Sequence, residues 1–292
     1  MDKKDYNLVM QLYPKVISMD VLEEKIRAIH LSIRNSRDFE LISNVYAEGL
    51  WKLHISNPSF FNYLLKRDKL VTLSVLMNYI FSGDIASLTE LYDFCGENKI
   101  SGRNNVVRLM DYMVHSGWVC LIKEKDRRRK TPVLTEKGRR GVDSFSLISI
   151  NALSVYDPEI SSKELLTDDF YGRFYANIAN YISLKINSLY NDVELLEMQS
   201  KSSGLVFLIR ILLDVRMGRM KIGEPIRSGF FKRFSGEIGI SHSHSKNLLA
   251  LLADGGLIEK KGMFYVIKDK LIESIEDTIS LRLAIVYCFI RA

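Results

Sequence analysis

The feature that most constrains this 292-residue chain is an internal repeat. "SGRNNVVRLMDYMVHSGWVCLI", from residue 101, and "ISHSHSKNLLALLADGGLIEKKGMFYVI", from residue 240, share one apolar pattern at a shift of 139 positions. The matched pairs are Leu109 with Leu248, Met113 with Leu252, Gly117 with Gly256 and Val119 with Ile258. Apolar residues one to four apart predict an amphipathic helix, and the glycine behind each stripe predicts its end. Two copies of one supersecondary unit are therefore expected.

The sequence around the first copy predicts a particular order of elements. Helices are expected over 69–83, 87–99 and 101–117, and two short extended stretches, "WVCLI" and "TPVLT", follow them. The charged segment "KEKDRRRK" joins the two stretches. Their apolar side is supplied by Trp118, Val119, Leu121, Val133 and Leu134. This is the order of a winged helix-turn-helix. The expected fold is therefore mainly α with small β-hairpin wings, as two tandem winged helix-turn-helix units plus flanking helices.

Positive charge is concentrated in the two copies. Residues 101–141 hold 11 Lys/Arg and four Asp/Glu, a net charge of +7, and residues 205–292 hold 14 and nine, a net of +5. Between them, residues 151–200 hold three and eight, a net of −5. Basic segments favour a polyanionic partner, although a modest excess of cations is also common on solvated surfaces. The four successive cations Arg127 to Lys130 fall in the hairpin, where they are placed to neutralise phosphates.

The segment "RLMDYMVHSGWVCLIKEKDRRRKTPVLTEKG" resembles the core of the MarR-type winged-helix family. That family has a glycine after the helix, an Asp-Arg-Arg core in the hairpin and a closing Leu-Thr-x-x-Gly. The corresponding residues here are Gly117, Asp126, Arg127, Arg128, Leu134, Thr135 and Gly138. The resemblance implies that Arg128 meets DNA and that Asp126 keeps the hairpin in shape. Pro132 departs from the family, which prefers a β-branched residue at that place.

The third helix of each copy carries polar residues off its apolar stripe, where they can reach base edges in the major groove. Arginine suits guanine and asparagine suits adenine, through paired hydrogen bonds. In the first copy the predicted DNA-contacting residues are Arg103, Asn104, Asn105 and Arg108 on the helix and Arg127, Arg128, Arg129 and Lys130 on the hairpin. In the second copy they are His242, Ser243, His244, Lys246 and Asn247 on the helix and Lys260 and Lys261 on a shorter hairpin. That second hairpin, "EKKGMF", lacks the Asp-Arg-Arg core, so the family's hairpin residues are not carried over to it.

Other kinds of chemistry find little support in the residue pattern. His242 and His244 are two positions apart and would point in different directions on a helix, so no metal site is expected. No Gly-rich phosphate loop follows a strand, and no Ser or Cys stands in a nucleophile motif, so neither an enzyme nor a cofactor is expected. The three cysteines are far apart, and no stretch has the pattern of a signal peptide or a membrane span. These observations predict a cytoplasmic protein.

The remaining sequence predicts helices around the two units. Asp20 and Glu23 have the spacing of a capping box, a second helix fits 37–53, and Pro58 suits the first turn of a third. Residues 170–199 predict one long amphipathic helix. Its apolar face is expected to hold Phe174, Ile178, Tyr181, Leu189, Val193 and Leu196, interrupted by Lys185. Its aromatics either pack in the core, which is favoured, or line an effector pocket; they are Phe170, Tyr171, Phe174, Tyr175 and Tyr181.

Four domains are expected from this organisation. They are an N-terminal helical segment (1–66), a first winged unit (67–145), a helical bridge (146–203), and a second winged unit with a C-terminal helix (204–292). MarR-type proteins dimerise through such flanking helices, so the resemblance implies that the bridge either makes a homodimer or joins the two units of one chain.

Together these patterns predict a sequence-specific, double-stranded DNA-binding transcriptional regulator. Two alternatives stay open: a plasmid-type replication initiator, which also carries two winged helices in one chain, and a winged-helix scaffold that binds protein. The hairpin cations argue against the scaffold, because charged residues are depleted at the core of protein interfaces. A homodimer and a small-molecule effector are left open as partners, and no membrane partner is expected.

Overall fold

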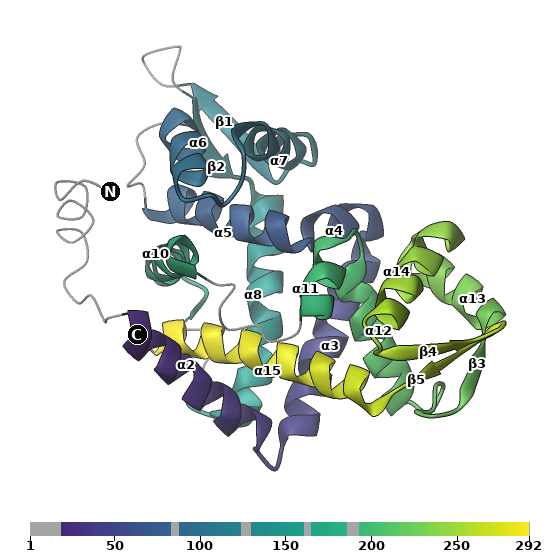
Figure 1. Cartoon of the computed structure of the whole chain (residues 1–292). Coiled ribbons are helices and arrows are strands. Elements are labelled where there is room, and N and C mark those ends of the chain that lie inside the picture. The colour runs from purple at the N-terminus through teal and green to yellow at the C-terminus, as the bar shows by residue number, and fades with distance from the viewer. Residues whose placement is uncertain (1–18, 83–87, 124–129, 161–164, 186–192, 292) are drawn as a thin grey trace.

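The computed structural model describes residues 19–82, 88–123, 130–160, 165–185 and 193–291, and it is mainly helical with two small antiparallel sheets (Figure 1). The helices before the first sheet are α2 (Met19–Arg34), α3 (Phe39–Ser56), α4 (Pro58–Leu64), α5 (Arg67–Ser82), α6 (Leu88–Glu97) and α7 (Arg103–His115). The helices after it are α8 (Glu136–Tyr156), α10 (Asp168–Lys185), α11 (Val193–Ser200), α12 (Gly204–Arg216), α13 (Ser228–Ile238), α14 (His242–Asp254) and α15 (Asp269–Ile290). The strands are β1 (Val119–Lys123), β2 (Lys130–Leu134), β3 (Pro225–Arg227), β4 (Ile258–Lys261) and β5 (Phe264–Ile267).

The first winged unit consists of α5, α6 and α7 followed by the hairpin of β1 and β2, in the order that the sequence predicts. Gly117 takes a φ of +72°, which turns the chain from the end of α7 into β1. The two strands pair antiparallel, with Val119 opposite Leu134 at one end and Lys123 opposite Lys130 at the other. Pro132 is buried opposite Leu121, so this departure from the family pattern is accommodated in the hairpin.

The closing Leu-Thr-x-x-Gly fastens the hairpin to α8. The Thr135 hydroxyl donates to the Gly117 carbonyl at 2.6 Å and accepts from the Gly138 amide at 3.0 Å, which caps the helix. A Cβ added to Gly138 would lie 1.9 Å from the Trp118 carbonyl oxygen, and one added to Gly141 would lie 1.9 Å from the Trp118 ring. Glycine is therefore required for α8 to start this close to the hairpin.

The second winged unit consists of α12, α13 and α14 with a three-stranded sheet in the order β3-β5-β4. The sequence predicts only a short hairpin in this unit, and the strand before α13 is not predicted. Pro225–Arg227 instead forms β3, with Ile226 opposite Tyr265 of β5. A strand of three residues is too short to show an alternating pattern, and its partner strand lies far along the chain.

The two units repeat each other most closely at their third helices. Residues 103–115 of α7, moved by 139 positions, are residues 242–254 of α14. The turns that follow match as well: the Trp118 amide donates to the Met113 carbonyl at 2.9 Å, and the Leu257 amide donates to the Leu252 carbonyl at 2.9 Å. The internal repeat inferred from the sequence is thus present in the backbone hydrogen bonding.

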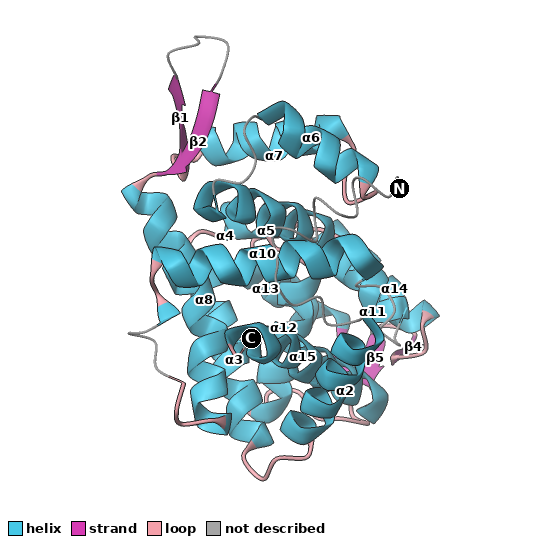
Figure 2. Ribbon diagram, turned by 90° about the vertical axis from the view of Figure 1, so that its left-hand side faces the viewer, coloured by secondary structure: helices cyan, strands magenta, loops and turns pink. Residues whose placement is uncertain are grey.

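The N-terminal helices form a framework on which both units are built. Helix α3 packs along α8 and also contacts α12, while α2 packs along the C-terminal helix α15 (Figures 1 and 2). Asp20 lies within the first turn of α2, so the capping box expected there is wrong. None of the helices in the described ranges is long and apolar enough to cross a membrane.

Helix α4 lies between the two units and contacts both. The Asn57 side chain caps it by accepting from the Phe60 amide at 3.2 Å. Toward the first unit, the Phe60 ring stacks on Trp118 with centroids 4.5 Å apart. Toward the second, the Asn62 amide donates to the carbonyls of Ile238 and Gly239 at 3.2 and 3.3 Å. Aromatic packing on one side and hydrogen bonds on the other hold the units around this short helix.

The bridge is built from two described helices, α10 and α11, where the sequence predicts one; residues 186–192 between them, including Leu189, lie outside the described residues. Helix α10 packs on α5. The predicted apolar face is displaced by about one position, since Phe174 and Ile178 are only partly buried. The buried residues are Phe170, Tyr171, Tyr175, Ala176, Ala179, Tyr181 and Ile182. Two of these are alanines, Ala176 and Ala179, and a pattern based on large side chains does not count them.

Candidate nucleic-acid interface

Helix α7 presents one polar face to solvent. Arg103, Asn104, Asn105 and Arg108 are all exposed, as their spacing predicts. The opposite face is buried and consists of Val106, Leu109, Met110 and Met113. The division follows from the helical period, because residues three and four apart share a face. The first unit therefore carries two cations and two amides on the face that is available to a partner.

The four polar residues of α7 have different surroundings. The Arg103 guanidinium lies over the Tyr92 ring at 5.3 Å from its centroid, an arrangement that holds the side chain against α6. Asn105 and Arg108 line a hollow shared with the α4–α5 junction. Asn104 is exposed and is not among the residues that line this hollow.

The hairpin of the first unit is described only in part. Asp126, Arg127, Arg128 and Arg129, the core of the predicted contact to phosphates, lie outside the described residues. Lys130 is the first residue of β2 and is exposed. It pairs in register with Lys123, so the described parts of the two neighbouring strands end at two cations.

Helix α14 carries the corresponding face of the second unit. Ser241 caps it by accepting from the His244 amide at 3.1 Å. Ser243, Lys246 and Asn247 are exposed, whereas His242 and His244 are partly buried.

One of these histidines is engaged within the chain. His244 Nε2 lies 2.7 Å from the Ser202 carbonyl oxygen, at the junction of α11 and α12. This contact corrects the expectation that His244 is a free polar residue on the helix surface: its ring holds the bridge against the second unit. The physical reason is tertiary, since α11 packs on α14.

The second hairpin is short, basic and tipped by an apolar residue. Lys260 and Lys261 of β4 are exposed, and the Lys261 ammonium pairs with Glu259 at 3.0 Å. Gly262 takes a φ of +61° at the turn, and the side chain of Met263 beside it is 74% exposed. Within the described residues, Lys260 forms no ion pair, so its charge is available to a partner.

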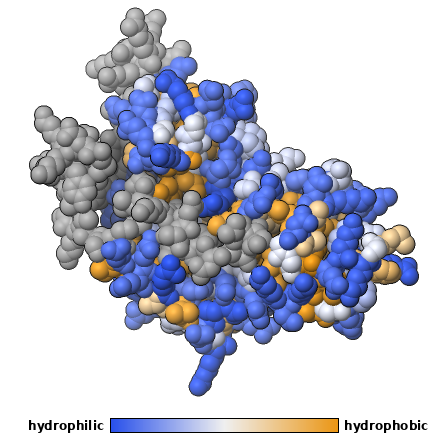
Figure 3. All heavy atoms as spheres, viewed as in Figure 1, coloured by the Kyte–Doolittle hydropathy of each residue, from blue (hydrophilic) through white to orange (hydrophobic). Residues whose placement is uncertain are grey.

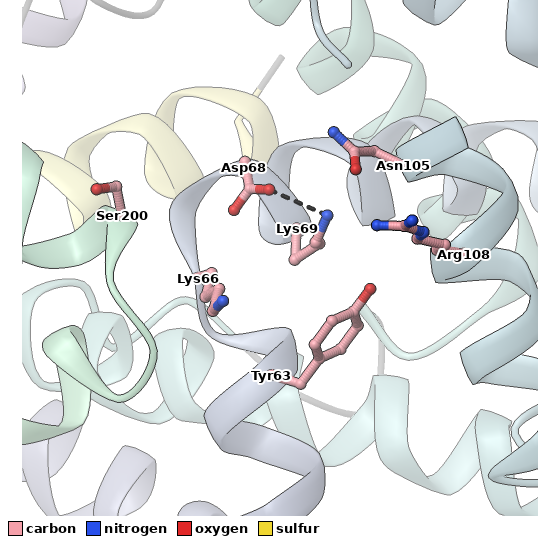
Figure 4. A pocket seen from close by; sticks show the side chains of 7 residues that line it. All are labelled: Tyr63, Lys66, Asp68, Lys69, Asn105, Arg108 and Ser200. Atoms are coloured by element: carbon pink, nitrogen blue, oxygen red, sulfur yellow. Dashed lines mark ion pairs between the residues drawn. The ribbon is translucent and has the colours of Figure 1, made fainter. Parts of the chain in front are cut away.

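The hollow beside α7 gathers residues that the sequence pattern did not connect (Figure 4). It has a volume of about 350 Å³ and is lined by Tyr63, Lys66, Asp68, Lys69, Asn105, Arg108 and Ser200. Lys69 is only 8% exposed, and its ammonium lies 3.1 Å from the Asp68 carboxylate. Lys66 and Lys69 were missed because they lie far from α7 in sequence. A signal was present, however: cations occupy the first turn of a helix, where acidic residues are favoured.

The aromatic residues of α10 pack in a junction with α5 and α8. The Phe81 and Tyr171 rings lie 4.9 Å apart, and the Tyr171 hydroxyl donates to Asp143 at 2.8 Å. Burial raises the pKa of Tyr171 and of Tyr175 well above the ordinary tyrosine value. The arrangement agrees with the core packing that the sequence favours for these residues.

The two buried thiols, Cys95 and Cys288, are poorly suited to nucleophilic chemistry. Burial raises the pKa of Cys95 to about 12 and also raises the pKa of Cys288. A thiol with such a pKa is almost entirely protonated near neutral pH, and the thiolate is the nucleophile. Within the described residues, no three His, Cys, Asp or Glu side chains gather as a metal ion would need.

The surface around these elements is mostly hydrophilic where it is described, with hydrophobic residues in smaller areas (Figure 3). The candidate site thus comprises two exposed polar helix faces, two basic hairpins and one hollow lined by cations. Comparison with protein-family models, with curated proteins and with solved structures finds no match to this chain, so the case for a function rests on the geometry given above.

Proposed function

We propose that the chain is a sequence-specific, double-stranded DNA-binding protein that regulates transcription and contacts DNA with two winged helix-turn-helix units. The observation that carries the proposal is the match between α7 and α14, two 13-residue helices at a shift of 139 that both bury an apolar face and expose a polar one. A helix of this kind fits the major groove, where arginine and amide side chains distinguish base edges.

The basic hairpins support the same proposal. A wing beside a recognition helix lies along the phosphate backbone, and its cations add affinity without sequence preference. Lys130 and Lys260 have this position in the two units. The MarR-like segment of the first unit supports a role as a regulator. The proposed relation to the MarR-type family covers that unit alone.

A replication initiator is the second candidate. It is favoured by the presence of two unequal winged units in one polypeptide, since such a chain can bind a site without twofold symmetry. The two classes differ in where their sites occur. Sites upstream of transcription units support the regulator, whereas short repeats clustered at an origin support the initiator.

The two helices predict an asymmetric binding site. Positions Arg103, Asn104 and Arg108 of α7 correspond to His242, Ser243 and Asn247 of α14, so the two units present different hydrogen-bonding groups. Selection of duplexes from a random pool by the full chain should therefore enrich one sequence with two dissimilar halves. Enrichment of a palindrome would contradict this, and an absence of enrichment would remove sequence-specific DNA binding altogether.

A single substitution tests whether α7 contacts bases. Asn104→Ala should weaken binding to the selected site by about 1–3 kcal/mol and leave random duplexes nearly unaffected, because a paired hydrogen bond to a base is lost. Asn35→Ala, which removes an exposed amide between α2 and α3, is the matched control and should change neither affinity. Equal losses on both duplexes would show that Asn104 does not contact a base.

A further inference from the structure

The hollow between α5 and α7 concentrates positive charge in one place. Among the described residues that line it, Lys66, Lys69 and Arg108 are cations and Asp68 is the one carboxylate, so these residues carry a net charge of +2. Figure 4 shows the Arg108 guanidinium and the Lys69 ammonium directed toward the middle of the hollow. Cations that line one hollow repel one another, and a bound anion offsets that repulsion.

Lys69 is the most constrained member of the cluster. Its side chain is nearly buried, with Asp68 at 3.1 Å as its ion-pair partner and the Tyr63 ring centroid 5.6 Å from its ammonium. A buried ammonium has three donors to satisfy, and a single carboxylate oxygen and a ring face do not use them all. An anion in the hollow would give this ammonium further acceptors besides the Asp68 carboxylate.

The position of the cluster on α5 points to the same ligand. Lys66 precedes the helix and Lys69 lies in its first turn. The amino end of a helix carries a partial positive charge, so cations there are unfavourable and anions are favourable. A phosphate at this end would therefore interact favourably with the helix dipole as well as with the side chains.

We propose that this hollow is a binding site for a phosphate group. Lys66, Lys69 and Arg108 neutralise the phosphate, while the Tyr63 hydroxyl and the Asn105 amide donate hydrogen bonds to its oxygens. The Ser200 hydroxyl donates to the Glu197 carbonyl at 2.6 Å, so Ser200 forms the wall of the site without donating to the ligand. The ion pair with Asp68 at 3.1 Å holds Lys69 in place.

The phosphate has two sources that this chemistry does not distinguish. One is a backbone phosphate of bound DNA, since Asn105 and Arg108 belong to the helix proposed to enter the groove; this source rests on the proposed function. The other is a free phosphorylated molecule. Because α11 of the bridge contributes a wall, such a ligand would contact the segment that leads to the second unit.

Inorganic pyrophosphate tests the free source without DNA. Calorimetric titration of the full chain should give saturable binding, and Lys66→Gln with Arg108→Gln should weaken it about tenfold or more, because charge-assisted hydrogen bonds are lost. Both side chains reach solvent, so the double variant should keep the wild-type unfolding temperature. Lys25→Gln, an exposed cation on α2, is the matched control and should bind as the wild type does.

Duplex DNA tests the other source. If the occupant is a backbone phosphate, pyrophosphate binds no better than chloride at equal ionic strength. The double variant then flattens the dependence of log affinity on log salt by about one unit, and Lys25→Gln does not. The proposal is overturned if the double variant leaves both pyrophosphate affinity and the salt slope unchanged. If the wild-type chain has no affinity for DNA, the proposed function is wrong. The pyrophosphate titration then still tests whether the hollow binds phosphate.

Discussion

At the scale of single residues, two glycines decide how the first hairpin joins the framework. Gly138 lies so close to the Trp118 carbonyl that a methyl group has no room, and Gly141 lies against the Trp118 ring. The Leu-Thr-x-x-Gly pattern found in the sequence therefore has a physical explanation in this chain: the threonine caps α8 and the glycine permits its close approach. Such contacts cannot be predicted from spacing, because they depend on which backbone atoms meet.

This packing predicts the effect of adding one carbon. Gly138→Ala places a Cβ 1.9 Å from a backbone oxygen that is fixed in the hairpin, so α8 must shift. Overpacking of this kind costs typically about 1–3 kcal/mol, which should appear as a lower free energy of unfolding in a urea titration.

Gly96→Ala is the matched control for this substitution. Gly96 lies in α6, and its added Cβ would meet nothing within 4 Å. Alanine is the better helix former, so this variant should gain roughly 0.5–1 kcal/mol. If Gly138→Ala is as stable as Gly96→Ala, the close approach of α8 to Trp118 is wrong.

At the scale of elements, a histidine joins α3 to the end of α13. His54 is fully buried, and its Nε2 lies 3.0 Å from the Ile238 carbonyl oxygen. Burial lowers the pKa of His54 below its ordinary value of 6.5, against the smaller opposing effect of the hydrogen bond to Ile238. Below pH 6.5 the unfolded chain therefore binds a proton that the folded chain does not, and stability falls as the solution becomes more acidic.

Substitution of His54 tests this linkage. The wild-type free energy of unfolding should fall between pH 7 and pH 5, with up to about 1.4 kcal/mol per pH unit from each such group. His54→Gln retains an amide donor for the Ile238 carbonyl but cannot titrate, so its stability should depend less on pH. Burial also lowers the pKa of His30. The free energy of unfolding of the double variant, His54→Gln with His30→Gln, should therefore depend on pH least. Parallel pH curves for wild type and His54→Gln would contradict the buried, neutral state of the ring.

The elements also show how far the sequence alone leads. The third helices and their glycine stops could be predicted, because a local apolar period and a turn residue define them. Strand β3, the buried face of α10 and the role of His244 could not, because each depends on a partner distant in sequence. The same holds for the hollow, where Lys66 and Lys69 meet Arg108 only after α5 and α7 have packed.

At the scale of the whole molecule, the N-terminal helices join the two units into one framework. Helix α3 contacts α8, which follows the first hairpin, and α12, which begins the second unit. Helix α2 packs along α15, which follows the second hairpin (Figure 2). In the proposed function, one chain accordingly supplies two recognition helices.

This arrangement predicts that the two hairpins contribute separately to the binding of one duplex. Arg127→Ala with Arg128→Ala in the first hairpin, and Lys260→Ala with Lys261→Ala in the second, should each flatten the slope of log affinity against log salt by roughly 1–2 units on the full selected site, because each neutralised phosphate releases about 0.9 counterion. Combining the four substitutions should flatten the slope by about the sum of the two separate effects.

A shortened duplex that keeps only the half contacted by the first unit separates the two hairpins. On this duplex, the Arg127 and Arg128 substitutions should still flatten the slope, and the Lys260 and Lys261 substitutions should have no effect. Salt titrations of the four proteins on both duplexes provide the measurement, with Lys25→Gln as the control for loss of a cation elsewhere. If the four substitutions together flatten the slope no more than one pair does, only one unit contacts the DNA backbone.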